Sequence, residues 1–126
     1  MLLHLTDISS EPLHGQLSRQ LREKILAGDL TAGTSLPSIR MLASEQRVSV
    51  ITVQRAYEDL EREGLIYSRR GKGFFVVELS GDRKQKIAVE RLAEAVEPVL
   101  TEALMTGLTV EQVRELIEGI LLEKGK

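Results

Sequence analysis

The chain has 126 residues, 42% of them hydrophobic, and a net charge of −2, which suits one small domain with an appendage. It contains no cysteine, so the sequence excludes a disulfide framework and thiolate chemistry. Only 3% of the residues are aromatic. This excludes an aromatic stacking platform for single-stranded nucleic acid and predicts a core of Leu, Ile, Val and Ala.

The start of the chain has neither a basic leader nor a long apolar run, and no stretch is long enough for a membrane span. We therefore expect a cytoplasmic protein that has no signal peptide and does not contact the membrane. Residues 2–8 alternate weakly between apolar and polar, which predicts a short strand or an extended arm.

A first helix is predicted from Pro12, which suits a helix start because its missing N–H would have no partner there. Gly28 is the stop signal, so this helix should end near Ala27. Residues 29–35 then form a turn-rich connection. The apolar stripe of the helix has a spacing of four: Leu13, Leu17, Leu21 and Ile25.

Two further helices are predicted with a tight turn between them. Ser38 caps the first of them, which ends near Glu45 or Gln46, and Ser49 caps the second. Val48 occupies the turn, where an apolar side chain can be buried. The core face of the second helix follows the i, i+3, i+4, i+7 pattern: Val53, Ala56, Tyr57 and Leu60.

That core face leaves a mixed group of side chains outside at the start of the same helix. Two are apolar and β-branched, which is unusual for a solvated surface but suits contact with thymine methyl groups in a major groove. The others offer donors and acceptors to base edges. The group consists of Val50, Ile51, Thr52, Gln54 and Arg55.

A hairpin is predicted next, with strands at Leu65–Ser68 and Phe74–Val77. The connection between them is basic and holds two glycines, which permit the positive φ angles of a tight turn. This tip consists of Arg69, Arg70, Gly71, Lys72 and Gly73. Helix, turn, helix and basic hairpin in this order indicate a winged helix-turn-helix, a fold that reads double-stranded DNA.

The distribution of charge fits this interpretation better than the net charge does. Residues 37–57 hold three arginines and one acid, and residues 69–72 hold three cations and no acid. Acids crowd the end of the second helix of the pair, so only its start is expected to approach phosphates. These acids are Glu58, Asp59, Glu61 and Glu63.

Beyond the polar stretch 80–86, two more helices are predicted. Pro98 should kink the first, Gly107 should end it, and Thr109 with Gln112 should form a capping box for the last. Two such helices are too small to enclose a core, so we expect a second copy of the chain to cover them. Packing onto the winged helix is the alternative. The predicted dimerisation residues are Val89, Leu92, Val96, Val99, Leu116, Ile117, Ile120 and Leu121.

The predicted architecture is therefore mainly α with a small β-wing. Residues 1–79 form the winged helix-turn-helix domain, and residues 80–126 form a helical dimerisation tail. No enzyme is predicted: His4 and His14 have no nucleophile, carboxylate pair or second metal ligand spaced around them. Glycines 71 and 73 lack the strand–loop–helix context of a phosphate loop. The sequence predicts no metal or cofactor and identifies no small-molecule effector.

Residues 11–77 resemble the GntR superfamily of bacterial winged-helix transcription regulators. The short tail resembles that of the YtrA-like branch, which mainly dimerises and lacks a large ligand-binding domain. The resemblance rests on a combination of residues: Pro12, Leu13, Gln16, Gly28, Gly33, Leu36, Pro37, Ser38, Arg40, Leu42, Ala43, Val48, Ser49, Thr52, Val53, Arg55, Ala56, Tyr57, Leu60, Glu61, Glu63, Gly64, Leu65, Ile66, Gly71, Lys72, Gly73, Phe75 and Val76.

The resemblance implies that Arg40 and Thr52 contact DNA together with the positions of Gln54 and Arg55, and that the wing tip at Arg70 and Gly71 does so too. We also expect Ser38 near the DNA and phosphate contacts from Arg69 and Lys72. The function expected is that of a homodimeric, sequence-specific repressor that binds a palindromic operator on the bacterial nucleoid. The alternative is a winged-helix interaction or architectural module that does not read DNA sequence.

Overall fold

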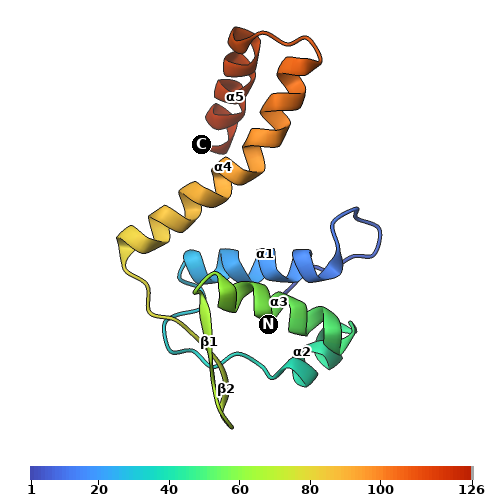
Figure 1. Ribbon diagram of the computed structural model, residues 1–126, viewed down its shortest axis with the longest axis vertical. Helices are drawn as coiled ribbons and strands as arrows, with labels where there is room; N and C mark the ends of the chain where they lie inside the picture. Colours follow the sequence, from blue (N-terminus) through green and yellow to red (C-terminus); the bar gives the residue numbers. More distant parts are fainter. Residues whose placement is uncertain (126) are drawn as a thin grey trace. The chain divides into compact units, whose positions relative to one another are not determined.

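The computed structural model describes residues 1–125. The chain forms two compact units, and the boundary between them along the sequence lies between Lys84 and Gln85. The first unit contains three helices and a hairpin (Figure 1). Their bounds are α1 Leu13–Leu26, α2 Ile39–Gln46, α3 Val50–Arg62, β1 Ile66–Arg69 and β2 Gly73–Val76. This element order confirms the predicted winged helix-turn-helix and the mainly α fold with a small β-wing.

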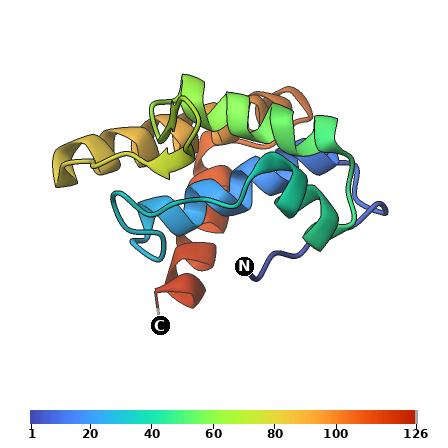
Figure 2. The same ribbon diagram turned by 90° about the horizontal axis from the view of Figure 1, so that it is seen from below.

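The core of the first unit lies where α1 and α3 pack side by side, as Figures 1 and 2 both show. From α1 it takes the apolar stripe, of which Leu17, Leu21 and Ile25 are buried. α2 and β1 pack against α3 on other sides. All four predicted core residues of α3 are buried: Val53, Ala56, Tyr57 and Leu60. Burial of these aliphatic faces supplies the main driving force for the fold.

Both predicted serine caps are confirmed. The Ser38 hydroxyl accepts the N–H of Met41 at 3.1 Å, and the Ser49 hydroxyl accepts the N–H of Thr52 at 3.0 Å. Arg47 closes α2 with φ of 56°, a left-handed conformation that costs a residue with a Cβ about 1–2 kcal/mol. The tight turn between α2 and α3 therefore depends on a left-handed residue. The sequence does not predict this conformation, because the position holds an arginine and not a glycine.

The hairpin strands differ from the prediction by one residue at each end. β1 pairs with β2 from Ile66 opposite Val76 to Arg69 opposite Gly73, so Leu65 and Val77 lie just outside and the tip narrows to residues 70–72. The connection at residues 33–36, of which 33–35 belong to the predicted turn, runs along the other edge of β2. It exchanges backbone hydrogen bonds of 2.8–3.0 Å with Phe74 and Val76.

Residues 1–6 form an extended arm without strand pairing, which decides between the two predicted possibilities. Two glutamines of α1 bind its backbone. The Gln20 amide bonds the N–H and C=O of His4 at 2.8 and 2.7 Å, and Gln16 does the same with Thr6 at 2.9 and 2.8 Å. Side-chain amides thus satisfy the backbone groups that a neighbouring strand would otherwise pair.

The second unit holds most of α4 (Gly81–Met105) and all of α5 (Val110–Lys124). The polar stretch 80–86 is helical from Gly81 on, and α4 runs through Pro98 as one helix. Gly107, with φ of 106°, follows its end. The predicted capping box of α5 is confirmed: Thr109 and Gln112 bond each other's backbone N–H at 3.1 and 2.9 Å. Across residues 1–125, none of the helices combines the length and apolar character that a membrane span requires.

Candidate DNA-binding surface

The start of α3 presents the mixed side chains that the sequence placed outside the core. Val50 and Ile51 are exposed, Ile51 to 61%, although both are apolar. Thr52 is half-buried, and its hydroxyl lies 2.8 Å from that of Ser49. Thr52, which is predicted to contact a base, is therefore hydrogen-bonded through its side chain to Ser49, the residue that caps α3. Exposed β-branched side chains beside hydroxyl groups offer both apolar and polar contacts to base edges.

Further along this exposed face lie Gln54 and Arg55. The Gln54 amide donates a hydrogen bond of 3.2 Å to the carboxylate of Glu58, one helical turn later. Arg55 joins none of the ion pairs found among residues 1–125. Its guanidinium is therefore available to an external anion.

The start of α2 lies beside the middle of α3, because the buried hydroxyl of Tyr57 donates a 2.7 Å hydrogen bond to the carbonyl of Pro37. This contact brings Ser38 and Arg40, both exposed, next to α3. The Ser38 oxygen already accepts the helix-capping bond, so its O–H remains the group available as a donor. Ser38 and Arg40 thus extend the surface formed by the start of α3.

The wing tip is a tight turn closed by a 2.9 Å bond from the N–H of Lys72 to the carbonyl of Arg69. Gly71 has φ of 74°, which the turn requires and which other residues adopt only with strain. Arg70 and Lys72 are exposed at the tip. The guanidinium of Arg69 lies 5.8 Å from the ring centre of Phe75, a cation–π contact that orients it on one face of the hairpin.

One acid of α3 holds the wing. The carboxylate of Glu61 accepts bonds from the N–H and hydroxyl of Ser68, at 3.3 and 3.0 Å. Because Ser68 precedes Arg69, this contact ties the basic tip to the recognition helix. In the sequence, Glu61 is one of the acids at the end of this helix, and nothing there predicts its contact with Ser68.

The cations of the first unit fall into two groups, those that join an ion pair and those that do not. In residues 1–125 the paired cations are Arg19, Arg22 and Arg62, which bind acids on α1 and α3 or next to them. None of the predicted DNA-binding cations joins a pair: Arg40, Arg55, Arg69, Arg70 and Lys72. Unpaired surface cations keep their full charge for phosphate oxygens.

Arg47 is a further exposed cation of this kind that sequence reasoning did not assign to the site. It lies in the turn between α2 and α3, two residues before the cap of α3, and makes no ion pair within the described chain. Its charge was a usable signal, but its left-handed backbone could not be read from the sequence.

The predicted dimerisation residues all lie on α4 and α5, within the second unit. Seven of them are exposed, among them Leu92 to 65% and Leu116 to 61%, and Val96 alone is half-buried. No residue of α5 is buried. The tail therefore leaves a large apolar area in water in a single chain.

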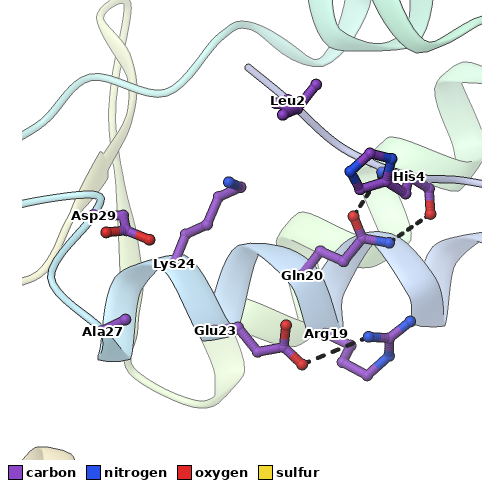
Figure 3. A pocket seen from close by; sticks show the side chains of 8 residues that line it. All are labelled: Leu2, His4, Arg19, Gln20, Glu23, Lys24, Ala27 and Asp29. Carbon is purple, nitrogen blue, oxygen red and sulfur yellow. Dashed lines mark hydrogen bonds and ion pairs between the residues drawn. The ribbon is translucent and has the colours of Figure 1, made fainter.

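A shallow hollow lies between α1 and the N-terminal arm (Figure 3). Figure 3 shows the Gln20 amide bound to His4 and the ion pair of Arg19 with Glu23 among the residues that line it. Both basic and acidic side chains line it: Arg19, Lys24, Glu23 and Asp29. None of the residues predicted to contact DNA lines this hollow.

Comparison with known proteins agrees with this geometry. The family described as "Bacterial regulatory proteins, gntR family" matches residues 13–76, which run from the start of α1 to the end of β2. The HTH-type transcriptional repressor YtrA of Bacillus subtilis is 30% identical over 119 residues, covering 94% of this chain and 92% of the relative.

Two solved structures extend the comparison. A GntR family transcriptional regulator from Listeria monocytogenes superposes with a TM-score of 0.72 at 28% identity, covering 88% of this chain and 96% of that one. The DNA-binding domain of AraR, solved in complex with operator ORE1, superposes with a TM-score of 0.52 at 27% identity, covering 61% of this chain and 94% of that one. The chain therefore belongs to the gntR family of bacterial regulatory proteins, and it is a winged-helix, DNA-binding regulator of transcription rather than an enzyme.

Proposed function

We propose that the protein is a cytoplasmic repressor that binds a palindromic operator as a homodimer and blocks transcription by occupying it. The start of α3 enters the major groove and reads bases, the wing tip contacts the flanking backbone, and the tail joins two chains. The observation that carries this proposal is the exposed group at the start of α3, apolar and polar together, accompanied by cations that join no ion pair within residues 1–125.

The major-groove role of α3 rests on the chemistry of its exposed face. Ile51 and Val50 offer methyl groups to thymine, while Thr52, Gln54 and Arg55 offer donors and acceptors. The acids of α3 lie toward its other end, so that end is repelled by phosphates. A helix with this polarity can approach DNA only by its first turns, as helix-turn-helix proteins do.

The wing and the start of α2 supply backbone contacts in this proposal. Arg69, Arg70 and Lys72 on the wing and Arg40 on α2 carry unpaired charges toward phosphates. Ser38 adds a hydroxyl donor, and Gly71 lets the wing tip approach DNA closely because it has no side chain. The relative YtrA of Bacillus subtilis is a transcriptional repressor, which supports repression as the outcome of binding.

The homodimer rests on the exposed apolar faces of α4 and α5. A second chain related by two-fold symmetry covers the same faces on both copies, which is the commonest arrangement in soluble oligomers. Two-fold symmetry also matches two half-sites of a palindrome, separated by about one helical turn or a multiple of it. The residues that form this interface are Val89, Leu92, Val96, Val99, Leu116, Ile117, Ile120 and Leu121.

Selection of bound duplexes from a random pool tests the proposal. We expect enrichment of one inverted repeat, and repression of a reporter that carries it next to a promoter. Lys72→Ala should weaken binding to all sequences about equally, whereas Gln54→Ala should change the preference at one base pair per half-site. Enrichment of no sequence would instead support an architectural role.

A further inference from the structure

We propose that Gln54 reads an adenine in the major groove, and that Glu58 is the positioning residue that makes it prefer adenine to guanine. This inference rests on the proposed function and adds to it the identity of one base in each half-site. It follows from a single side-chain pair on the exposed face of α3.

The two side chains lie four residues apart, so they are neighbours on the helix surface. Nε2 of Gln54 donates to Oε1 of Glu58 at 3.2 Å. Within residues 1–125, the carboxylate of Glu58 belongs to no ion pair, so the Gln54 amide is its hydrogen-bond partner. Both residues are exposed, and the pair is therefore reachable from a groove.

The hydrogen bond changes what the amide can offer to a base. A free Gln amide carries two N–H donors and one carbonyl acceptor. Because Glu58 engages one N–H, the outward edge of Gln54 keeps one donor and one acceptor. This edge therefore pairs fully with a base that presents one acceptor and one donor in the groove.

Adenine presents that complement in the major groove, since its N7 accepts and its N6 amino group donates. Guanine presents two acceptors there, N7 and O6, and would need both N–H groups of the amide. Cytosine and thymine each offer a single polar group, so they use only half of the edge. Adenine is therefore the one base that satisfies the held amide completely.

Charge reinforces the same choice. The carboxylate of Glu58 lies beside the amide and repels the two acceptor atoms of guanine more than the mixed edge of adenine. It also repels nearby phosphates, which lowers affinity for all sequences alike. Glu58 thus favours discrimination at the expense of general affinity.

The test uses the full-length chain and the duplex that it selects from a random pool. Scanning the half-site with wild type and Gln54→Ala identifies the base pair whose preference depends on Gln54. We expect adenine there. Replacing it by 7-deazaadenine, which lacks the N7 acceptor, should weaken wild-type binding by about one order of magnitude and leave Gln54→Ala unaffected.

Two variants of Glu58 then separate positioning from simple charge. Glu58→Ala frees the second N–H of Gln54, so the ratio of adenine to guanine affinity should fall by about 3-fold or more while binding to random duplex increases. Glu58→Gln removes the charge but keeps a carbonyl that accepts the same bond. It should therefore retain most of the ratio, losing only the part that the charge supplies, and it should still bind random duplex more strongly.

The outcomes are distinct. A wild-type protein that prefers no sequence contradicts the proposed function itself. A selective protein whose Gln54-dependent base is not adenine, or whose adenine-to-guanine ratio is unchanged in Glu58→Ala, contradicts only the inference. Loss of the ratio in both Glu58 variants would show that charge alone acts, which also overturns the positioning role.

Discussion

Arg22 on α1 and Glu63 just after α3 form a bidentate ion pair, with two N–O distances of 2.8 Å between residues that are 41 positions apart. The Arg22 side chain is only 8% exposed. The pair joins the scaffold helix to the end of the recognition helix. The packing of α3 on α1 is therefore held by this contact as well as by the apolar core between the two helices.

Removing the guanidinium should cost stability. Arg22→Met leaves the carboxylate of Glu63 partly buried without its partner, and we expect the free energy of unfolding to fall by about 2 kcal/mol. Arg62→Met is the matched control, because its pair with Asp59 is exposed, with Arg62 73% accessible, and should contribute less than about 0.5 kcal/mol. Urea denaturation measures both. Equal losses in the two variants would show that the buried pair has no special role.

The turn between α2 and α3 should become more stable when its strain is removed. Arg47→Gly places a residue that adopts positive φ freely at the left-handed position, and we expect about 1 kcal/mol of added stability. Arg40→Gly, inside α2, should instead destabilise by about 1 kcal/mol. Thermal unfolding distinguishes the two. If Arg47→Gly also destabilises, the arginine side chain contributes a contact that outweighs its backbone strain.

Alkaline pH should destabilise the first unit through Tyr57. Burial raises the pKa of the Tyr57 hydroxyl above its ordinary value of about 10, and the nearby Glu45 raises it further. A raised pKa in the folded state means that the stabilisation is complete below the unfolded pKa and is lost as pH rises above it. Unfolding free energies measured from pH 8 to 11 should fall above about pH 10.

Tyr57→Phe provides the control for this pH dependence. It removes the ionisable group together with its bond to Pro37, so the variant should be less stable at neutral pH by about 1 kcal/mol. Its stability should also fall less steeply above about pH 10. An identical alkaline decline in the variant would assign the effect to another group.

The tail should determine the oligomeric state. Leu116→Glu together with Ile120→Glu places two charges on the exposed apolar face of α5, and we expect a folded monomer at micromolar concentration where the wild type is a dimer. Glu118→Lys changes charge on the same helix at another exposed position and should remain dimeric. Analytical ultracentrifugation measures the masses. A wild-type monomer, or a double variant that still dimerises, would contradict the interface.

Loss of the dimer should also weaken binding to a full palindrome far more than binding to a half-site. In the dimer, the second half-site is bound at a high effective concentration, which the monomer lacks. A double variant that binds the full palindrome as tightly as wild type would separate dimerisation from operator binding.

The sequence predicted the helices well because their signals are local. The starts of three helices could be predicted from their capping residues, Ser38, Ser49 and Thr109. The apolar spacing along α1 and α3 identified these two segments as helices. The i, i+3, i+4, i+7 spacing of the core residues of α3 then identified its outer residues by elimination. Local side-chain chemistry thus accounts for most of the fold and for the list of candidate DNA contacts.

Long-range contacts could not be predicted in the same way. The pairing of residues 33–36 with β2 joins segments about 40 positions apart through backbone groups, which carry no sequence signal. The two arm-binding glutamines and the contact of Glu61 with Ser68 use common polar residues whose partners depend on the folded geometry. Each strand is shifted by one residue because the turn closes between Arg69 and Lys72, around Gly71. The sequence holds two glycines in this segment, so it did not predict where the turn would close.

The most direct test of the account is the affinity of the wild-type chain for its selected palindrome and for a shuffled duplex of the same composition, measured by fluorescence anisotropy over a range of salt. We predict a preference of about 1000-fold or more for the palindrome. Log affinity should fall linearly with log salt, by about 0.9 for each phosphate neutralised. Equal affinity for the two duplexes with a flat salt response would contradict the assignment of this protein as a sequence-specific DNA-binding regulator.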